Sequence, residues 1–246
     1  METPDSRRFI PTVRLDVVLL LLAAIGGSVD VMSYFQFHTF TANMTGNTIL
    51  LGISKGDGKL SSSMHSLTAL MGFISGTFLG AFIVEKKEAR WTSYITLSLT
   101  IETIIIAAFS ALSFFYTASE SSYLIYLTIA LSAIAMGMQS ATIRYLKIPG
   151  IVTTFITGTI TSIGMSVVQG MRKGFKKIED DTLETPGAKN LEQRIELQAM
   201  VLLAYGATAI ITGWIEYHGS KFLPALPLIL MISVLVMSSR FKDLKV

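Results

Sequence analysis

Six apolar segments, each about as long as a membrane-spanning helix, dominate the sequence and limit what the chain can fold into. A helix needs about 20 mostly apolar residues to cross the hydrocarbon core of a bilayer. The segments of this length are 16–36, 65–84, 92–114, 123–143, 197–216 and 222–239. Only 15% of the residues are charged, against about 25% in a typical soluble domain. The sequence therefore predicts an all-α, polytopic integral membrane protein.

Two further apolar stretches, 39–53 and 151–171, are rich in Thr, Gly and Asn, which loosen or break a helix. If both stretches re-enter the membrane, six crossings place 17 of the 20 Lys and Arg residues on one side, leaving only Lys55, Lys59 and Lys221 on the other. If both cross, eight crossings divide these residues 14 to 6. Positive residues gather on the cytoplasmic side, so both arrangements put both termini in the cytoplasm and the sharper bias favours six crossings. The expected location is the bacterial inner membrane.

The membrane domain has an internal repeat. Thr45-Gly46-Asn47 in the first odd stretch matches Thr157-Gly158-Thr159 in the second, and each follows an apolar helix with polar residues near its end. We expect a cytoplasmic tail over 1–15 and one membrane domain over 16–240, built of repeats 16–115 and 122–240 with a charged loop at 172–196. Each repeat is a helix, a broken Thr-Gly segment and two more helices. Three crossings per repeat would invert the second half, as in many transporters.

The pattern Gly27-x-x-Asp30, followed by Phe40-Thr-Ala-Asn43-Met-Thr45-Gly46-Asn47, resembles the YoaK-like family of bacterial membrane proteins. The resemblance covers about 16–240 and implies a fold of six transmembrane helices, with transport as the usual presumption for a family of unknown function. It also implies an amide after Gly-x-Gln in the second repeat, where this chain has Ser140.

Two acids lie in the interior of predicted spans, away from their ends: Asp30 and Glu102. A carboxylate in the membrane costs about 2.5 kcal/mol or more on insertion scales and often marks a functional site. Each acid is therefore a candidate proton-coupling or cation-binding group facing a polar cavity. The alternative for each is a structural acid that is hydrogen-bonded to a neighbouring helix or to a broken backbone.

The two Thr-Gly segments are the strongest site candidates, because a half-helix starting there would direct its N-terminal amides at the midplane. Such an end suits an anionic group of a substrate, or Asp30 as an internal partner. Arg144 is a candidate partner of Asp30 or of a substrate anion, or else an interfacial residue with its head group in water. The candidate substrate-binding or coupling residues are Asp30, Asn43, Thr45, Gly46, Asn47, Glu102, Gln139, Arg144, Thr157, Gly158 and Thr159.

Other chemistries find no support in the sequence. There is no cysteine, and His38, His65 and His218 are scattered, so no metal site is expected. No nucleotide-binding or hydrolase motif occurs, and no basic stripe for nucleic acid. We expect no cofactor, no catalytic residue and no enzyme.

The leading hypothesis is a small-solute secondary transporter or permease, proton-coupled through one of the acids, whose partners are the lipid bilayer and an unknown solute. The alternative is a non-transporting interaction or assembly protein. That alternative would use loop 172–196 and two small-residue helix faces, one of Gly72, Gly76 and Gly80 and one of Ala209 and Gly213, which can also support a homo-oligomer.

Overall fold

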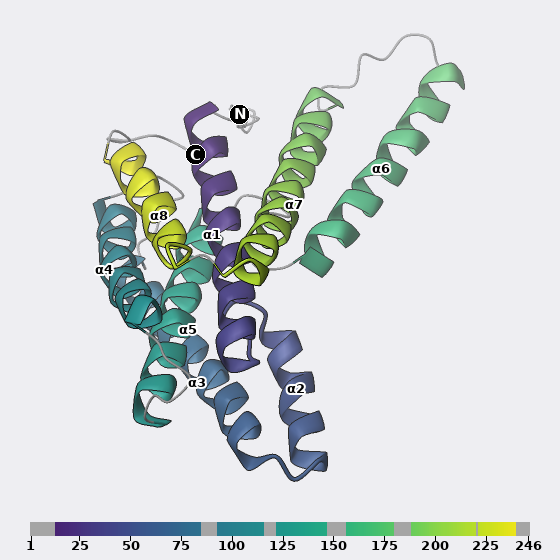
Figure 1. Cartoon of the computed structure of the whole chain (residues 1–246). Helices are drawn as coiled ribbons and strands as arrows, with labels where there is room; N and C mark the ends of the chain where they lie inside the picture. Colours follow the sequence, from purple (N-terminus) through teal and green to yellow (C-terminus); the bar gives the residue numbers. More distant parts are fainter. Residues whose placement is uncertain are drawn as a thin grey trace.

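The computed structural model describes residues 13–84, 93–115, 122–146, 156–179, 188–219 and 221–239, and within these ranges it contains helices and no strand (Figure 1). The predicted all-α membrane fold is confirmed. The helices are α1 (Val13–Phe37), α2 (Met44–Gly56), α3 (Leu60–Val84), α4 (Ser93–Phe115), α5 (Ser122–Tyr145), α6 (Ile156–Glu179), α7 (Ala188–Tyr217) and α8 (Ala225–Ser238).

Five described helices, α1, α3, α4, α5 and α7, are long and apolar enough to cross a membrane. The sixth predicted span, 222–239, is shorter than expected, because α8 has 14 residues and begins after Pro224. A helix of that length is about 21 Å long, less than the hydrocarbon thickness of about 30 Å. Proline lacks an N–H and is favoured at helix starts, which explains why the helix does not include the residues before it.

The first broken stretch is a loop followed by a half-helix. His38 ends α1 in the left-handed conformation, with φ of 53°, a common way to terminate a helix. Asn43 then caps α2, as its side-chain oxygen accepts a hydrogen bond from the Gly46 amide at 3.1 Å. Helix α2 has only 13 residues, which is too short to cross a bilayer.

The second broken segment is longer than predicted. Helix α6 continues to Glu179 and α7 already begins at Ala188, so much of the predicted loop 172–196 is helical. Lys, Arg, Glu, Gln and Ala dominate these stretches, and all five favour helix even when they are solvated. The charge run was correctly identified as polar but wrongly interpreted as loop.

Helices α2 and α6 each run in the general direction of the helix before them. In Figure 1, α2 runs onward from the lower end of α1, and α6 runs in the direction of α5. The start of α1 and the end of α8 lie at the same end of the molecule.

The packing follows the same pattern in both repeats. Helix α3 packs along α5 as α7 packs along α1, α2 packs on α3 as α6 packs on α7, and α4 packs on α5 as α8 packs on α1. Two spatial units result, and each contains helices from both repeats. We call them the α1 unit (α1, α6, α7 and α8) and the α5 unit (α2, α3, α4 and α5). The units meet where α4 packs on α8 and α1 on α5.

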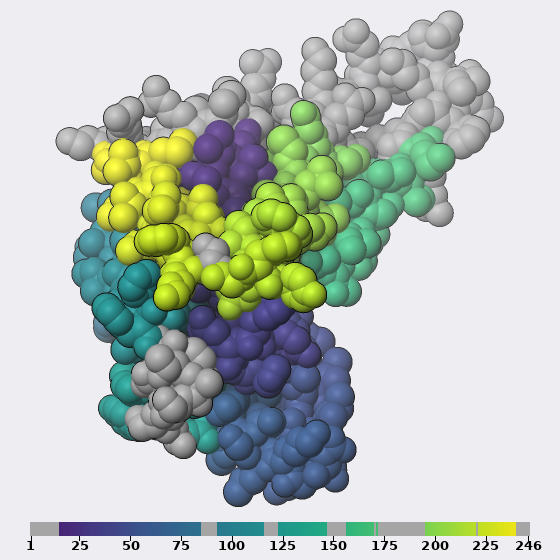
Figure 2. Space-filling model, viewed as in Figure 1, coloured from purple at the N-terminus to yellow at the C-terminus, as the bar shows by residue number. Residues whose placement is uncertain are grey.

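Glycine contacts hold each unit together. A Cβ atom on Gly76 of α3 would overlap the backbone carbonyl of Ile134 on α5, and one on Gly137 would overlap that of Phe73. Such close approach of backbones is the usual source of helix association in lipid. In Figure 2, α1 is visible between α8 and α7, and α6 stands out to one side beside α7.

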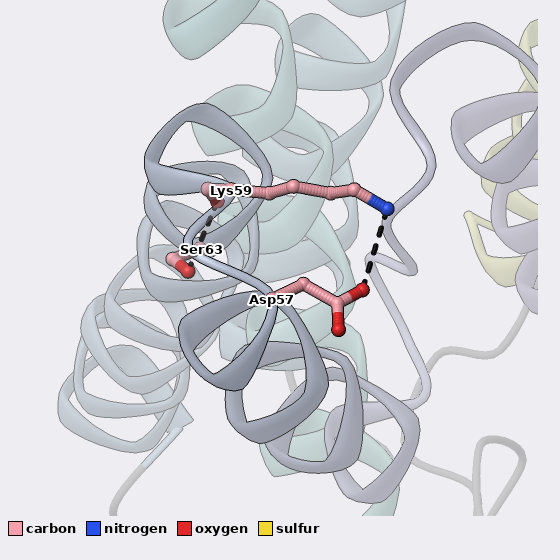
Figure 3. Close-up of polar contacts among 3 residues, drawn as sticks. All are labelled: Asp57, Lys59 and Ser63. Carbon is pink, nitrogen blue, oxygen red and sulfur yellow. Dashed lines mark hydrogen bonds and ion pairs between the residues drawn. The ribbon is translucent and has the colours of Figure 1, made fainter.

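The turn between α2 and α3 lies at the end of the molecule opposite the start of α1 and the end of α8 (Figure 1), and Figure 3 shows its polar contacts. Gly58 has a φ of 71°, which favours glycine there. Lys59 Nζ pairs with Asp57 Oδ2 at 3.3 Å, and the Ser63 hydroxyl donates to the Lys59 carbonyl at 3.2 Å. The ion pair is largely exposed, so it contributes little to stability.

Candidate functional site

Asp30 is the centre of the first half of the site. Its Oδ1 accepts hydrogen bonds from the backbone amides of Thr41 at 2.8 Å, Ala42 at 2.7 Å and Asn43 at 3.3 Å. Three successive amides directed at one oxygen form an anion-binding nest. The nest lies directly before the N-terminus of α2. Asp30 is thus the hydrogen-bond acceptor at this helix end, the position that one of the alternatives from the sequence gave it.

The nest keeps its shape because Asn47 ties the loop to the first turn of α2. Its Oδ1 accepts from the Thr39 hydroxyl at 2.9 Å and from the Phe40 amide at 2.9 Å, while its Nδ2 donates to the Phe40 carbonyl at 2.6 Å. The ring of Phe40 lies over Gly46, where a Cβ atom would come within 2.8 Å of it. The motif from Phe40 to Asn47 is therefore one folded unit around Asp30.

Tyr205 of α7 completes the coordination of Asp30. Its hydroxyl donates to Asp30 Oδ2 at 2.6 Å, a short bond to a carboxylate and so of the stronger kind. Gly27 makes this reach possible, because a Cβ atom there would lie 2.5 Å from the Tyr205 carbonyl oxygen. The spacing Gly27-x-x-Asp30 thus lets α7 approach α1 and puts the acceptor one turn away.

The two Thr-Gly segments line one cavity of about 500 Å³. Thr45 and Gly46 come from the start of α2, and Thr157 and Gly158 from the start of α6, with Tyr205 in the wall. In Figure 1 these two helix ends face each other near mid-height of the molecule. The cavity lies between the α1 unit and the α5 unit, so motifs that are 112 residues apart in the sequence meet at one place.

Replacing Tyr205 by phenylalanine removes the hydroxyl that bonds Asp30 Oδ2. We expect a loss of about 1 to 3 kcal/mol, because a bond to a buried charged group is lost. The apparent melting temperature of the protein in detergent should fall by about 2 to 4 °C for each kcal/mol. The matched control is Tyr217→Phe, since Tyr217 is 82% exposed. Equal melting temperatures of the two variants would contradict the role given to Tyr205.

The remaining predicted site residues lie outside the cavity wall. Thr159 is buried one residue beyond the Thr157-Gly158 pair. Gln139 of α5 donates from Nε2 to the Leu22 carbonyl of α1 at 3.0 Å, where the two units meet. Glu102 lies within α4, and Arg144 is exposed at the end of α5. Arg144 is not a partner of Asp30, whose hydrogen bonds come from the nest and Tyr205, so one of the three alternatives given for Arg144 is contradicted.

The repeat equivalents of Asp30 and Tyr205 are Ser140 and Phe73. Gly137 meets the Phe73 carbonyl as Gly27 meets the Tyr205 carbonyl. Ser140 follows Gly137 by three residues, as Asp30 follows Gly27. Phenylalanine has no hydroxyl to donate, and serine has no carboxylate to receive one. Positions 73 and 140 therefore do not repeat the hydroxyl-to-carboxylate bond of Tyr205 and Asp30.

Sequence reasoning missed Tyr205. A tyrosine within an apolar span needs a hydrogen-bond partner for its hydroxyl, and that was the available signal. Among the described residues there is no group of three His, Cys, Asp or Glu side chains that could hold a metal ion.

The fold and the site define a polytopic, all-α membrane protein of two repeats whose broken helices meet at one cavity. The family model described as "Protein of unknown function (DUF1275)" matches residues 18–237. The chain is 33% identical over 223 residues to the UPF0700 transmembrane protein YoaK of Bacillus subtilis (strain 168), an alignment that covers 90% of this chain and 92% of that one. No solved structure matches. The chain therefore belongs to the DUF1275 family, and the resemblance to YoaK-like proteins is confirmed.

Proposed function

We propose that the protein is a secondary transporter or permease for a small polar solute, which binds in the cavity between the starts of α2 and α6. One observation carries the proposal: each repeat contributes a Thr-Gly helix start to the same cavity of about 500 Å³. Pockets for small ligands commonly have volumes of about 300 to 1,000 Å³. Midplane sites between discontinuous helices of inverted repeats are the usual transporter arrangement.

The packing suggests which parts move. The sequence halves are interlocked, since α3 of the first repeat packs on α5 and α7 of the second packs on α1. Rocking of one repeat against the other would break both glycine-lined contacts. We propose instead that the α1 unit and the α5 unit tilt against each other. The cavity lies between these units, so such a movement would open it to each side in turn.

The wider setting belongs to the same proposal. The protein resides in the bacterial inner membrane with both termini in the cytoplasm, as the distribution of Lys and Arg supports. Its role is transport rather than catalysis. The two small-residue faces offer no support for an interaction protein, because Gly72, Gly76 and Gly80 pack on α5, while Ala209 and Gly213 pack on α1.

Chemical modification of single introduced cysteines tests the proposal. Because the chain has no natural cysteine, a thiol reagent reacts only at the introduced position. Purified protein in vesicles is screened for counterflow of small anions, zwitterions and neutral polar solutes. We expect Thr157→Cys to lose most of the flux after reaction with a charged methanethiosulfonate reagent, and a transported solute to slow that reaction. The control is Ser61→Cys, an exposed position at the start of α3, far from the cavity wall. No flux of any solute, or equal inhibition of both variants, would contradict the proposal.

A further inference from the structure

Glu102 is a buried acid outside the cavity, and the site described above does not use it. Its side chain in the middle of α4 is 0% exposed. Among the described residues neither carboxyl oxygen has a hydrogen-bond partner. Asp30, by contrast, has four donors. A buried carboxylate without donors or a counter-ion costs several kcal/mol, whereas a neutral carboxylic acid avoids most of that cost.

No charged group of the packed helices compensates Glu102. Helix α4 packs on α3, α5 and α8. Within the helix bounds, α8 has no ionisable residue, and the ionisable residues of the others are His65 on α3, Tyr94 on α4 itself, and Tyr123, Tyr126, Arg144 and Tyr145 on α5.

The register between α4 and α5 separates Arg144 from this acid. Ser98 and Thr142 bond to each other at 2.8 Å. Glu102 lies one turn from that pair towards the C-terminal end of α4, and Arg144 lies on the other side of it. Leu99 and Ile106, which flank Glu102 on the buried face of α4, belong to the apolar core.

We propose that Glu102 is a proton-binding site, separate from the solute cavity, which holds a proton in this packing and releases it when α4 and α8 part. Release breaks the O–H bond of the acid, transfers the proton to water and leaves a hydrated carboxylate. The assignment of this proton to transport rests on the proposed function. In that setting the proton is the coupling ion and Glu102 is the residue that carries it.

The position of α4 explains why release would be linked to movement. Helix α4 belongs to the α5 unit and α8 to the α1 unit, and their contact is one of the two places where the units meet. Leu99 and Ile106, which flank Glu102, belong to the same apolar core as Met231 and Val234 of α8, so tilting of the units would open the cavity and admit water to Glu102 in the same step. A proton could then leave only in the conformation that exchanges solute, which is the requirement for coupling.

Infrared spectroscopy of the purified protein in lipid vesicles tests the protonation directly and needs no solute. At neutral pH we expect the carbonyl stretching band of a protonated carboxylic acid, and we expect Glu102→Gln to abolish it. The control is Glu196→Gln, at an exposed position of α7, which should leave the band unchanged. The proposal is overturned if the wild-type protein lacks the band or if Glu102→Gln retains it.

A second measurement tests the route of release. The rings of Phe114 on α4 and Phe222, just before α8, are 6.5 Å apart, so Phe114→Cys with Phe222→Cys can be joined by a short bifunctional thiol reagent. Linking should slow deuterium exchange of the carboxyl band by about tenfold or more, because exchange needs this local opening. A monofunctional reagent on the same cysteines is the control. Equal exchange rates would overturn the release route, whatever the solute screen shows.

Discussion

Asp30→Ala is expected to destabilise the protein by about 4 kcal/mol or more, since it leaves several buried donors without their acceptor at once. Three of these donors are the successive amides of Thr41, Ala42 and Asn43, and the fourth is the Tyr205 hydroxyl. Without the carboxylate, the loop loses the hydrogen bonds that hold it against α1, and α2 loses the acidic group at its N-terminus. The melting temperature in detergent should fall by about 8 °C or more.

The Asp30→Asn variant keeps the shape of the side chain and removes its negative charge, so it tests the two contributions separately. An amide oxygen can still accept from the nest, and the amide nitrogen can donate to the Tyr205 oxygen, so we expect an intermediate melting temperature. Glu102→Gln is the second comparison, because that side chain accepts no hydrogen bond from the described residues. It should cost little, since glutamine is similar in size to a neutral glutamic acid. Equal losses in Asp30→Ala and Glu102→Gln would contradict the distinction drawn between the two acids.

The sequence predicted the helices well, because long apolar runs leave the chain few other choices in lipid. Five of the six predicted spans match helices of spanning length. The predicted helix bounds were wrong where the apolar character of the residues does not decide whether they are helical. The end of α6 and the start of α7 are helical through the intrinsic propensity of charged residues, and α8 is shortened by the backbone chemistry of Pro224.

The first half of the site could be predicted in part. The Phe40–Asn47 motif and Gly27-x-x-Asp30 both proved to form one connected structure, as polar groups in an apolar setting must find partners. The partner Tyr205 lies 175 residues from Asp30, and no local pattern shows which helix packs against which. Whether the cavity residues bind a solute stays a prediction.

The internal repeat made the meeting of Thr45-Gly46 and Thr157-Gly158 predictable in principle, since symmetric elements meet at the symmetry axis. The interlocking of the repeats was not predictable from periodicity. It depends on the close approach of α3 to α5 and of α7 to α1, which only the glycine contacts reveal. The movement that we propose is therefore a tilt of the α1 unit against the α5 unit, and not of one repeat against the other.

Gly76→Val is expected to be the most damaging change at the contact between α3 and α5. A Cβ atom at Gly76 would overlap the Ile134 backbone carbonyl, and a backbone atom cannot move aside as the end of a flexible side chain can. The two helices would have to separate along their length, with the loss of packing on both. Overpacking commonly costs about 1 to 3 kcal/mol, and valine at a backbone contact should lie at or above the upper end. A reduced melting temperature and reduced yield of monodisperse protein would show this.

Gly206→Val is the matched control, because no neighbouring atom lies within 4 Å of a Cβ at Gly206 on α7. Both substitutions place the same β-branched residue in an apolar helix, so lost glycine flexibility and altered helix propensity act equally. Only the contact with Ile134 differs. Gly137→Ala probes the same interface from the other side, through the Phe73 carbonyl. Once Gly76→Val has separated the helices, adding Gly137→Ala should cost less than it does alone, whereas simple additivity would mean that the two glycines do not share one contact.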